Sequence, residues 1–370
     1  MTQHIDRATN FPKETTVTAR EDKKMRSSVI AGLAVAVSVM ALSACGTSTA
    51  PAAAAKNGCS DTHLSTVRVS EVIHSVFYAP QYVADSKGFF CQEGIKLETD
   101  TSQGSDKGTA ALLSNSADVA LVGPETAVFI QNNKQSTTKV KAFAQATATD
   151  GSFLVGHSAQ PDFTWDDVRG KTIIGWRPGS EPEMVLEYVL KQHGLTPGKD
   201  VTVKTNIAAP AMAGAFLAKQ GDYVTLYQPT VSALAGKGGY MIRPLAQDVG
   251  ELPETVYVAT NDYIASHKAI IQKFTDAVAK AENWIQTASP EAIEKAIAPA
   301  FDTTSPEQLV ASTKAYQAAN GWPKSPLMTE QGFAKLEQIM VAGGVLKEKD
   351  FVQYHDVVDT TFAGNAKVGN

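Results

Sequence analysis

Two turns in the sequence carry side chains that could recognise a small molecule. Trp176 and Arg177 come shortly before Ser180, where a helix is expected to begin, and Glu125 follows a Gly-Pro pair at the start of another predicted helix. Arg177 could pair with an anionic ligand, and the backbone N–H groups of helix N-termini suit an anion or a carbonyl oxygen. Glu125 could accept a hydrogen bond from an amine or a ring N–H. These residue types indicate binding of a small organic anion or a nitrogen heterocycle and do not choose between the two.

Each of these charged residues also has a structural interpretation. Arg177 could face solvent or bridge to Glu181 or Glu183, a contact that contributes little at an exposed position. Glu125 could simply stabilise the dipole of the helix that it begins. The sequence does not separate these interpretations from ligand binding.

Aromatic side chains fall in or beside the same predicted loops, where they could stack on a flat ring. Trp176 is the preferred candidate, whereas core packing is the favoured interpretation of Phe153 and Tyr227. The predicted ligand-binding residues are Tyr78, Glu125, Trp176, Arg177, Ser180, Phe77 and Gln228.

Residue patterns typical of enzymes and metal sites are missing from the sequence. The seven histidines contain no His-Glu-x-x-His pattern and no close pair for a metal. Residues 156–160 lack the last glycine of a nucleophile elbow. Residues 165–172 end like a Walker A loop, but Trp165 replaces its first glycine and Lys171 enters a strand. We therefore expect no catalytic residue, no cofactor and no metal.

The elements that must position the candidate residues alternate between strand and helix as far as residue 259. Such alternation predicts parallel sheets covered by helices on both faces, and beyond Asn261 the apolar residues recur at helical spacing. Predicted strands cover residues 67–73, 95–101, 118–122, 140–147, 171–175, 201–205, 223–227, 241–245 and 254–259, and another begins near Phe153. Predicted helices cover residues 79–90, 106–113, 183–193 and 211–219, and another begins at Glu125.

This order of elements predicts an α/β fold of two lobes joined by a two-strand hinge near residues 147–154 and 255–260. Residues 66–150 and 255–370 would form the first lobe, and residues 151–254 the second. Ligands of open α/β sheets bind beyond the carboxyl ends of the strands. The loops selected by that rule are residues 74–78, 103–105, 123–125, 150–153, 176–181 and 227–228.

The first 45 residues have the pattern of a bacterial lipoprotein signal peptide. Basic residues 23–26 precede an apolar run at 29–42, and residues 42–45 read Leu-Ser-Ala-Cys. Cys45 would be acylated and become the mature N-terminus. An uncleaved signal anchor is the alternative, although the run is shorter than the roughly 20 residues of a membrane-spanning helix. Met25 is the expected true start, since residues 1–24 are polar and aperiodic, with an unusually long n-region as the alternative.

A flexible tether and two further cysteines follow the lipobox. Residues 46–65 begin with a Thr/Ser/Ala-rich stretch that has nothing to pack. Cys59 and Cys91 would lie outside the cytoplasm, where disulfides persist. We expect a bond between them, with two unrelated thiols as the alternative.

Composition excludes some classes of function. With 43% apolar and 19% charged residues in 370, a globular body of two lobes is expected. The net charge of -5 and the lack of a Lys/Arg cluster argue against a nucleic-acid partner.

Several motifs, taken in order, resemble one family of transport proteins. Residues 78–84 read Tyr-Ala-Pro-Gln-Tyr-Val-Ala, residues 87–90 read Lys-Gly-Phe-Phe, and residues 93–95 read Glu-Gly-Ile before a strand. Residues 110–120, 175–184 and 221–229 add further matching stretches. From about residue 67 to 346 the chain resembles ABC-transporter substrate-binding proteins of the sulfonate/nitrate/taurine and thiamine-pyrimidine branch.

The resemblance implies a periplasmic-binding-protein-like fold that closes on its ligand by a hinge. Its implied partners are a small-molecule ligand and an ABC permease with its ATPase. With the lipobox, we expect a monomer that is lipid-anchored on the extracytoplasmic face of the cell membrane. One alternative is a pyrimidine-synthesis enzyme of the same fold, but that would carry a cysteine-rich iron-binding stretch and no export signal. Another is a surface lipoprotein that binds a second protein.

Overall fold

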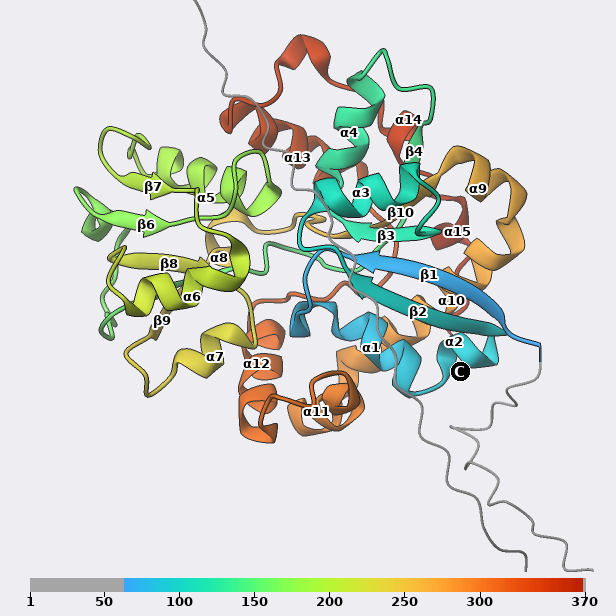
Figure 1. Ribbon diagram of the computed structural model, residues 1–370, viewed down its shortest axis with the longest axis horizontal. Coiled ribbons are helices and arrows are strands. Elements are labelled where there is room, and N and C mark those ends of the chain that lie inside the picture. Colours follow the sequence, from blue (N-terminus) through green and yellow to red (C-terminus); the bar gives the residue numbers. More distant parts are fainter. Residues whose placement is uncertain (1–62, 369–370) are drawn as a thin grey trace, which may run out of the picture. The chain divides into compact units, whose positions relative to one another are not determined.

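The computed structural model describes residues 63–368, whose strands form two five-stranded sheets, sheet A and sheet B (Figure 1). The strand order is β2-β1-β3-β10-β4 in sheet A and β7-β6-β8-β5-β9 in sheet B. Sheet A contains β1 (Ser65–Glu71), β2 (Ile95–Thr101), β3 (Val119–Val122), β4 (Val140–Gln145) and β10 (Val256–Thr260). Sheet B contains β5 (Phe153–Gly156), β6 (Thr172–Ile174), β7 (Thr202–Lys204), β8 (Tyr223–Leu226) and β9 (Tyr240–Pro244). The predicted α/β fold with two lobes is confirmed.

The prediction of wholly parallel sheets is wrong for one strand in each sheet. β1 runs parallel to β2 and β3, and β6 runs parallel to β7 and β8. However, β10 is antiparallel to β3 and β4, and β5 is antiparallel to β8 and β9. Both exceptions follow a crossover from the other sheet. A chain that arrives from the other lobe enters at the edge where the parallel strands end, so it must run in the opposite direction.

The two crossovers lie side by side. Ala146 N donates to Thr255 O at 2.9 Å, and Leu252 N donates to Ala148 O at 3.0 Å. The irregular parts of the two connections are residues 146–152 and, after the short helix at residues 246–249, residues 250–255, because residues 256–260 already belong to β10 of sheet A. The second predicted hinge segment was therefore placed too late in the sequence.

Helices cover both sheets and make up most of the chain after residue 260. Helices α3 and α4 lie on one face of sheet A, and α1 and α10 on the other (Figure 1). The helices before β10 are α1 (Ala79–Ser86), α2 (Phe89–Gln92), α3 (Ser105–Leu113), α4 (Glu125–Asn132), α5 (Glu181–Gln192), α6 (Ala209–Leu217), α7 (Thr230–Leu234) and α8 (Ala246–Val249). Those after it are α9 (Asn261–Ser266), α10 (Lys268–Thr287), α11 (Pro290–Ile297), α12 (Pro306–Ala318), α13 (Glu330–Ala342), α14 (Tyr354–Val357) and α15 (Thr361–Gly364). Short 3-10 turns are η2 (Val76–Tyr78), η3 (Trp165–Val168), η4 (Ala298–Ala300) and η5 (Glu348–Asp350).

Between residues 63 and 368, no helix is both long and apolar enough to cross a lipid bilayer.

The single helix predicted for residues 79–90 is two helices, α1 and α2. Gly88 separates them with a φ of 74°, a left-handed conformation that glycine adopts without steric cost. Cys91 lies in α2 and is disulfide-bonded. Cys59 lies outside the described residues, as do Cys45 and the signal region, so the Cys59–Cys91 pairing stays a prediction.

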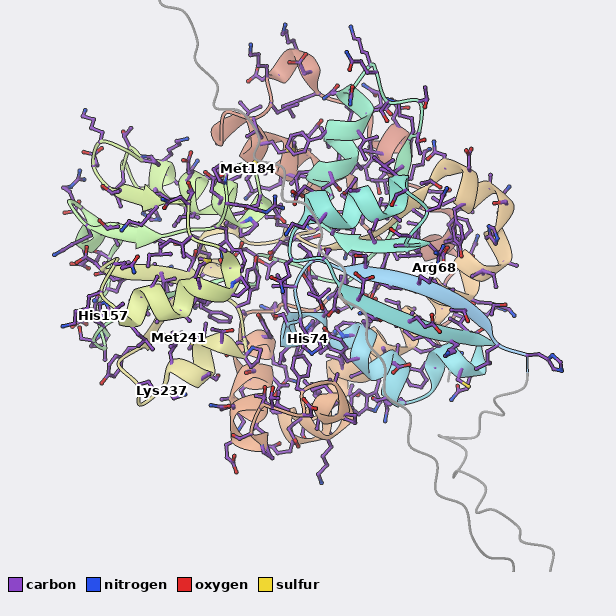
Figure 2. The ribbon with its side chains drawn as sticks, in the orientation of Figure 1. Arg68, His74, His157, Met184, Lys237 and Met241 are labelled. Carbon is purple, nitrogen blue, oxygen red and sulfur yellow. The ribbon has the colours of Figure 1, made fainter. Side chains whose placement is uncertain are left out.

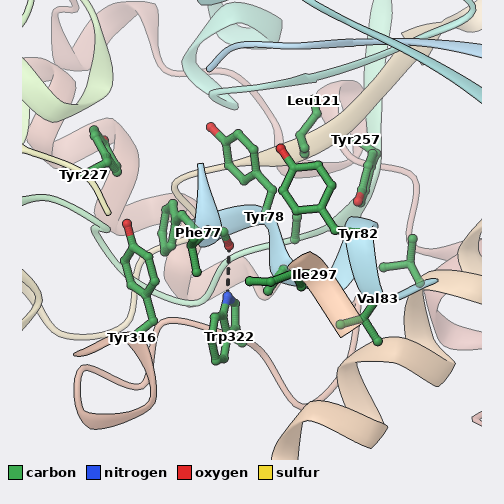
Figure 3. Packing of buried hydrophobic residues seen from close by; sticks show 14 of the residues in the cluster. Phe77, Tyr78, Tyr82, Val83, Leu121, Tyr227, Tyr257, Ile297, Tyr316 and Trp322 are labelled. Atoms are coloured by element: carbon green, nitrogen blue, oxygen red, sulfur yellow. Dashed lines mark hydrogen bonds between the residues drawn. The ribbon is translucent and has the colours of Figure 1, made fainter. Parts of the chain in front are cut away.

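The C-terminal helices contact both lobes rather than only the first. α10 packs against α1 and α15, whereas α12 contacts α7 and α13 contacts α5. Figure 3 shows part of the aromatic core that results: Phe77 lies beside Tyr316, with ring centroids 4.9 Å apart, and Trp322 Nε1 donates to Phe77 O at 2.9 Å. These contacts surround the point where the two sheets meet.

Candidate functional site

A cavity of about 240 Å³ lies between loops of sheet A and loops of sheet B. From sheet A it is lined by Ile73 after β1, residues 103–107 after β2, and Glu125 after β3. From sheet B it is lined by Trp176 after β6 and residues 207–210 after β7. The cavity therefore occupies the position beyond the carboxyl ends of the strands at which ligands of open α/β sheets bind.

Five of the seven predicted ligand-binding residues line this cavity. They are Tyr78, Glu125, Trp176, Arg177 and Ser180. Tyr78 and Glu125 come from the sheet A side and the other three from the sheet B side, so the fold brings together residues more than 100 positions apart in sequence.

Phe77 and Gln228 are not among the residues that line the cavity. Phe77 is fully buried in the aromatic core beside Tyr316. Gln228 is also buried, and its side-chain Oε1 accepts from Ser232 N at 2.9 Å and from Ser312 Oγ at 3.2 Å. Both side chains connect the lobes through packing and hydrogen bonds instead of facing the cavity.

Arg177 pairs with a carboxylate of the opposite lobe. Its Nη1 lies 2.8 Å from Oδ1 of Asp106, a residue of α3. The sequence left open a bridge from Arg177 to Glu181 or Glu183, but the ion pair that forms is with Asp106. Gly104 makes this approach possible, since a Cβ there would lie 2.5 Å from Asp106 Oδ1 and 3.4 Å from Arg177 Cζ.

Glu125 is almost completely buried at the start of α4. Its Oε2 has no hydrogen-bond partner in the part of the chain that the structure describes. Burial raises the pKa of Glu125 to about 7, while its own backbone N–H, Arg177 and a hydrogen bond from Ser105 act in the opposite direction. The carboxyl lies against Gly123, where a Cβ would come within 1.9 Å of Oε2.

Two more carboxyl groups of the cavity come from Glu181 and Glu254. Neither oxygen of Glu181 has a partner among the described residues, and the residue is 2% exposed. Burial raises the pKa of Glu181 well above its ordinary value, and the charges of Glu254, Glu125 and Asp150 raise it further. Glu254, by contrast, accepts hydrogen bonds from the Tyr227 hydroxyl and from Gly151 N.

The helix N-termini at the cavity offer less to an anion than the sequence suggested. At α4, the backbone N–H of Glu125 hydrogen-bonds to the carboxyl group of the same residue. At α5, Pro182 has no N–H, and Glu183 N donates to Ser180 O at 3.1 Å. The Ser180 hydroxyl in turn donates to Arg177 O at 2.7 Å. A carboxylate side chain thus stands at the first position of each helix, where a bound anion would lie.

Aromatic rings form the apolar part of the cavity wall. Trp176 meets Tyr227 edge to face, with ring centroids 5.0 Å apart at 75°. Trp176 Nε1 is buried without a hydrogen-bond partner in the described region. Tyr78 adds a third ring from the opposite lobe and is 2% exposed. The core packing favoured for Phe153 agrees with its burial, whereas Tyr227 also lines the cavity.

Sequence reasoning missed several lining residues for identifiable reasons. The loop after β7 supplies residues 207–210, yet the strand-end rule was not applied to that strand. Asp106 begins the predicted helix directly after the predicted loop 103–105. Glu181 ends the predicted loop 176–181, but the sequence indicated for it only a possible bridge to Arg177. Glu254 lies in a crossover, and no local pattern marks it as facing a cavity.

Two histidines of the described residues lie in different lobes. Figure 2 shows His74 after β1 and His157 beyond the end of β5 in the other lobe. Across residues 63–368, no three His, Cys, Asp or Glu side chains are grouped so that they could hold a metal ion.

Two α/β lobes around a partly polar cavity define a protein built to bind a small molecule between them. The chain belongs to the NMT1/THI5-like family, whose sequence pattern matches residues 77–293. This assignment confirms the family resemblance inferred from the sequence motifs.

Individual relatives agree with the family and with the fold. Over 301 residues, 81% of this chain and 89% of the relative, the chain is 38% identical to "Putative binding protein YtlA" of Bacillus subtilis (strain 168). The ligand-binding component of an ABC-type import system from Staphylococcus aureus, solved with zinc bound, has a similar fold with a TM-score of 0.68 at 16% identity, covering 82% of this chain and 99% of that one. The alkanesulfonate-binding protein SsuA from Xanthomonas axonopodis pv. citri, bound to MOPS, gives a TM-score of 0.63 at 16% identity, covering 80% and 98%.

Proposed function

We propose that this protein is the substrate-binding component of an ABC importer. It captures a small organic anion or a nitrogen heterocycle outside the cytoplasm and delivers it to a permease, which an ATPase drives. The cavity between the lobes carries this proposal, because residues from both sheets line it and several buried polar atoms within it have no partner. The similar fold of an import-system component and of an alkanesulfonate-binding protein supports the same class of function.

Within this proposal, Tyr78 and Trp176 contact the ligand together with Glu125 and Ser180. Arg177 acts on closure of the cleft through its ion pair with Asp106. The aromatic rings would hold an apolar or flat part of the ligand, and the charged groups would fix its orientation. Phe77 and Gln228 would then act only indirectly, by holding the lobes together through the contacts described above.

A thermal-shift screen tests the proposal directly. The full-length protein is heated with pyrimidines, sulfonates, nitrate and amino acids, each in large excess. A ligand present at a hundred times its dissociation constant adds about 2.7 kcal/mol to the free energy of unfolding. If no compound in the panel raises the melting temperature, the proposed function is contradicted.

We also propose that the ligand is released unchanged, so that the protein is not an enzyme. The 38% identity to a protein named as a binding protein supports this view. Mass spectrometry of the bound compound after long incubation should return its original mass, and a new product would contradict the proposal.

The proposed site of action is the extracytoplasmic face of the cell membrane, where a lipid on Cys45 would anchor a monomer. The apolar run at residues 29–42 and the Leu-Ser-Ala-Cys sequence support this proposal. Cys45→Ser should release the protein or leave it unprocessed. Unchanged acylation of the variant would exclude Cys45 as the anchor.

A further inference from the structure

Two carboxyl groups that face the cavity from opposite lobes have oxygens without a hydrogen-bond partner among the described residues. Glu125 begins α4 beside sheet A, and Glu181 begins α5 beside sheet B. The residues are 1% and 2% exposed, and one oxygen of Glu125 and both oxygens of Glu181 are without a hydrogen bond in the described chain. Burying an ionised carboxylate without a donor is strongly unfavourable. An ionised carboxylate only accepts hydrogen bonds, so whatever satisfies these oxygens must donate.

The other charged groups of the cavity do not meet this need. Arg177 is already paired with Asp106 at 2.8 Å, and Lys107 is exposed. Glu254 is itself satisfied by Tyr227 and Gly151. Four carboxyl groups and two basic groups line the cavity in total, so the carboxyls outnumber the cations that could pair with them.

We propose that Glu125 and Glu181 act as a pair, the carboxylate clamp, which binds a positively charged or N–H-rich group of a small ligand, such as an amidinium or an aminated ring. This inference rests on the proposed function and chooses between the two ligand classes left open there. Because one carboxylate comes from each lobe, the bound group would join the lobes as the cleft closes.

The electrostatics of the cavity agree with the carboxylate clamp. Burial raises the pKa of Glu181, and the charges of Glu254, Glu125 and Asp150 raise it further. A bound cation would remove the repulsion and favour the ionised forms. An anion would add to the repulsion, and it would meet a carboxylate at the N-terminus of α4 and of α5.

The remaining unsatisfied group suggests a second feature of the ligand. Trp176 Nε1 is a buried donor without a partner, and an indole N–H can only donate. A ligand that also offers an acceptor, such as a ring nitrogen or a carbonyl oxygen, would satisfy it. The cavity of about 240 Å³ is smaller than the roughly 300–1,000 Å³ of sites for drug-sized ligands, so the ligand is compact.

Benzamidine, benzamide and benzoate test the carboxylate clamp, because they share one ring and one size but differ in charge. With the full-length protein near pH 8, calorimetry should show binding of benzamidine, weaker binding of benzamide and no binding of benzoate. Glu125→Gln and Glu181→Gln should each weaken benzamidine binding by about tenfold to a hundredfold, the range for a hydrogen bond to a charged group.

Glu183→Gln is the matched control. Glu183 lies two residues from Glu181 in the same helix, but it does not line the cavity, and its carboxyl accepts from Gly179 N. This variant should bind benzamidine like the wild type. The glutamine at position 125 or 181 replaces an unsatisfied carboxyl with a neutral group of the same shape, so both variants should fold with an unchanged or higher melting temperature.

The outcomes separate the inference from the proposed function. If benzoate, nitrate or a sulfonate binds and benzamidine does not, the carboxylate clamp is overturned while the proposed function stands. Unchanged benzamidine affinity in both clamp variants also overturns it. If neither the benzene series nor the wider screen yields a ligand, both proposals fail.

Discussion

Arg177 of the second lobe and Asp106 of the first form an ion pair with Nη1 and Oδ1 2.8 Å apart. Arg177 follows β6, whereas Asp106 lies in α3, so the contact exists only when the two sides of the cavity are close together. Both side chains also line the cavity. An arginine that the sequence offered as an anion ligand is thereby paired with a carboxylate of the opposite lobe.

Breaking this pair should weaken ligand binding only slightly. The side chains are 39% and 63% exposed, so solvent screens the attraction. Such pairs contribute about 0.2–1 kcal/mol, or up to about fivefold in affinity. We expect Arg177→Ala to lower the affinity for benzamidine by no more than this amount, as measured by calorimetry.

A double-mutant cycle with Asp106→Asn isolates the pair. If closure depends on the contact, the two single variants should have similar effects and the double variant should be no worse than either. Strictly additive effects would show that the pair does not couple the lobes. A loss of benzamidine binding of a hundredfold or more in Arg177→Ala alone would mean that Arg177 itself contacts the ligand.

The affinity for a cationic ligand should rise with pH. Burial raises the pKa of Glu125 to about 7. Burial also raises the pKa values of Glu181, Glu254 and Asp150. A bound cation holds these carboxyls ionised, so below about pH 7 binding must release protons. Benzamidine affinity should therefore increase from about pH 5 through pH 7.

The change of affinity with pH should have opposite signs for a cationic and an anionic ligand. The carboxyls with a raised pKa, Glu125 and Glu181, both line the cavity and carry the expected change. Benzoate, if it binds at all, should bind better at low pH, because protonation removes the repulsion. Glu125→Gln should flatten the benzamidine profile, and an unaltered profile in that variant would assign the titration to another group.

The sequence predicted the elements of this fold better than the side chains that face one another. Strand and helix spacing located the strands around residues such as Val119 and Ile173, because burial on both faces leaves a continuous apolar run. The antiparallel direction of β5 and β10 depends on which lobe the chain arrives from, which no local pattern records. Likewise, the strand-end rule placed Trp176 and Glu125 at the cavity, but the pairing of Arg177 with Asp106 depends on how the two lobes meet.

Trp176 should contribute ring contact and one hydrogen bond to ligand binding. It packs edge to face on Tyr227 and has an unpartnered Nε1. Trp176→Ala should weaken benzamidine binding by about tenfold, since a ring contact contributes roughly 0.5–1.5 kcal/mol in addition to the buried area. Trp176→Phe should retain most of the binding of benzamidine and lose more for ligands with an acceptor atom.

Trp284→Ala provides the control for a lost indole. Trp284 lies in α10 and contacts Lys87 rather than the cavity, with Lys87 Nζ 4.1 Å from its ring centroid. This variant should lower the melting temperature without changing affinity. Equal affinity in Trp176→Ala and the wild type, measured by calorimetry, would remove the ring from the binding site.

The position of the Glu125 carboxyl depends on the absence of a side chain at residue 123. A Cβ on Gly123 would lie 1.9 Å from Glu125 Oε2 and 2.5 Å from its Cδ, far inside van der Waals contact. The clash involves the end of a flexible side chain, so Gly123→Ala should displace the carboxyl rather than unfold the protein. We expect this variant to lose benzamidine affinity to about the same extent as Glu125→Gln, although the glutamate itself is retained.

Gly214→Ala in α6 is the matched control, because a Cβ there meets nothing within 4 Å, and alanine favours a helix by about 0.5–1 kcal/mol. It should bind normally and melt slightly higher. If Gly123→Ala binds benzamidine as the wild type does, the carboxylate can serve the ligand from another position, and the placement of Glu125 against Gly123 has no role in recognition.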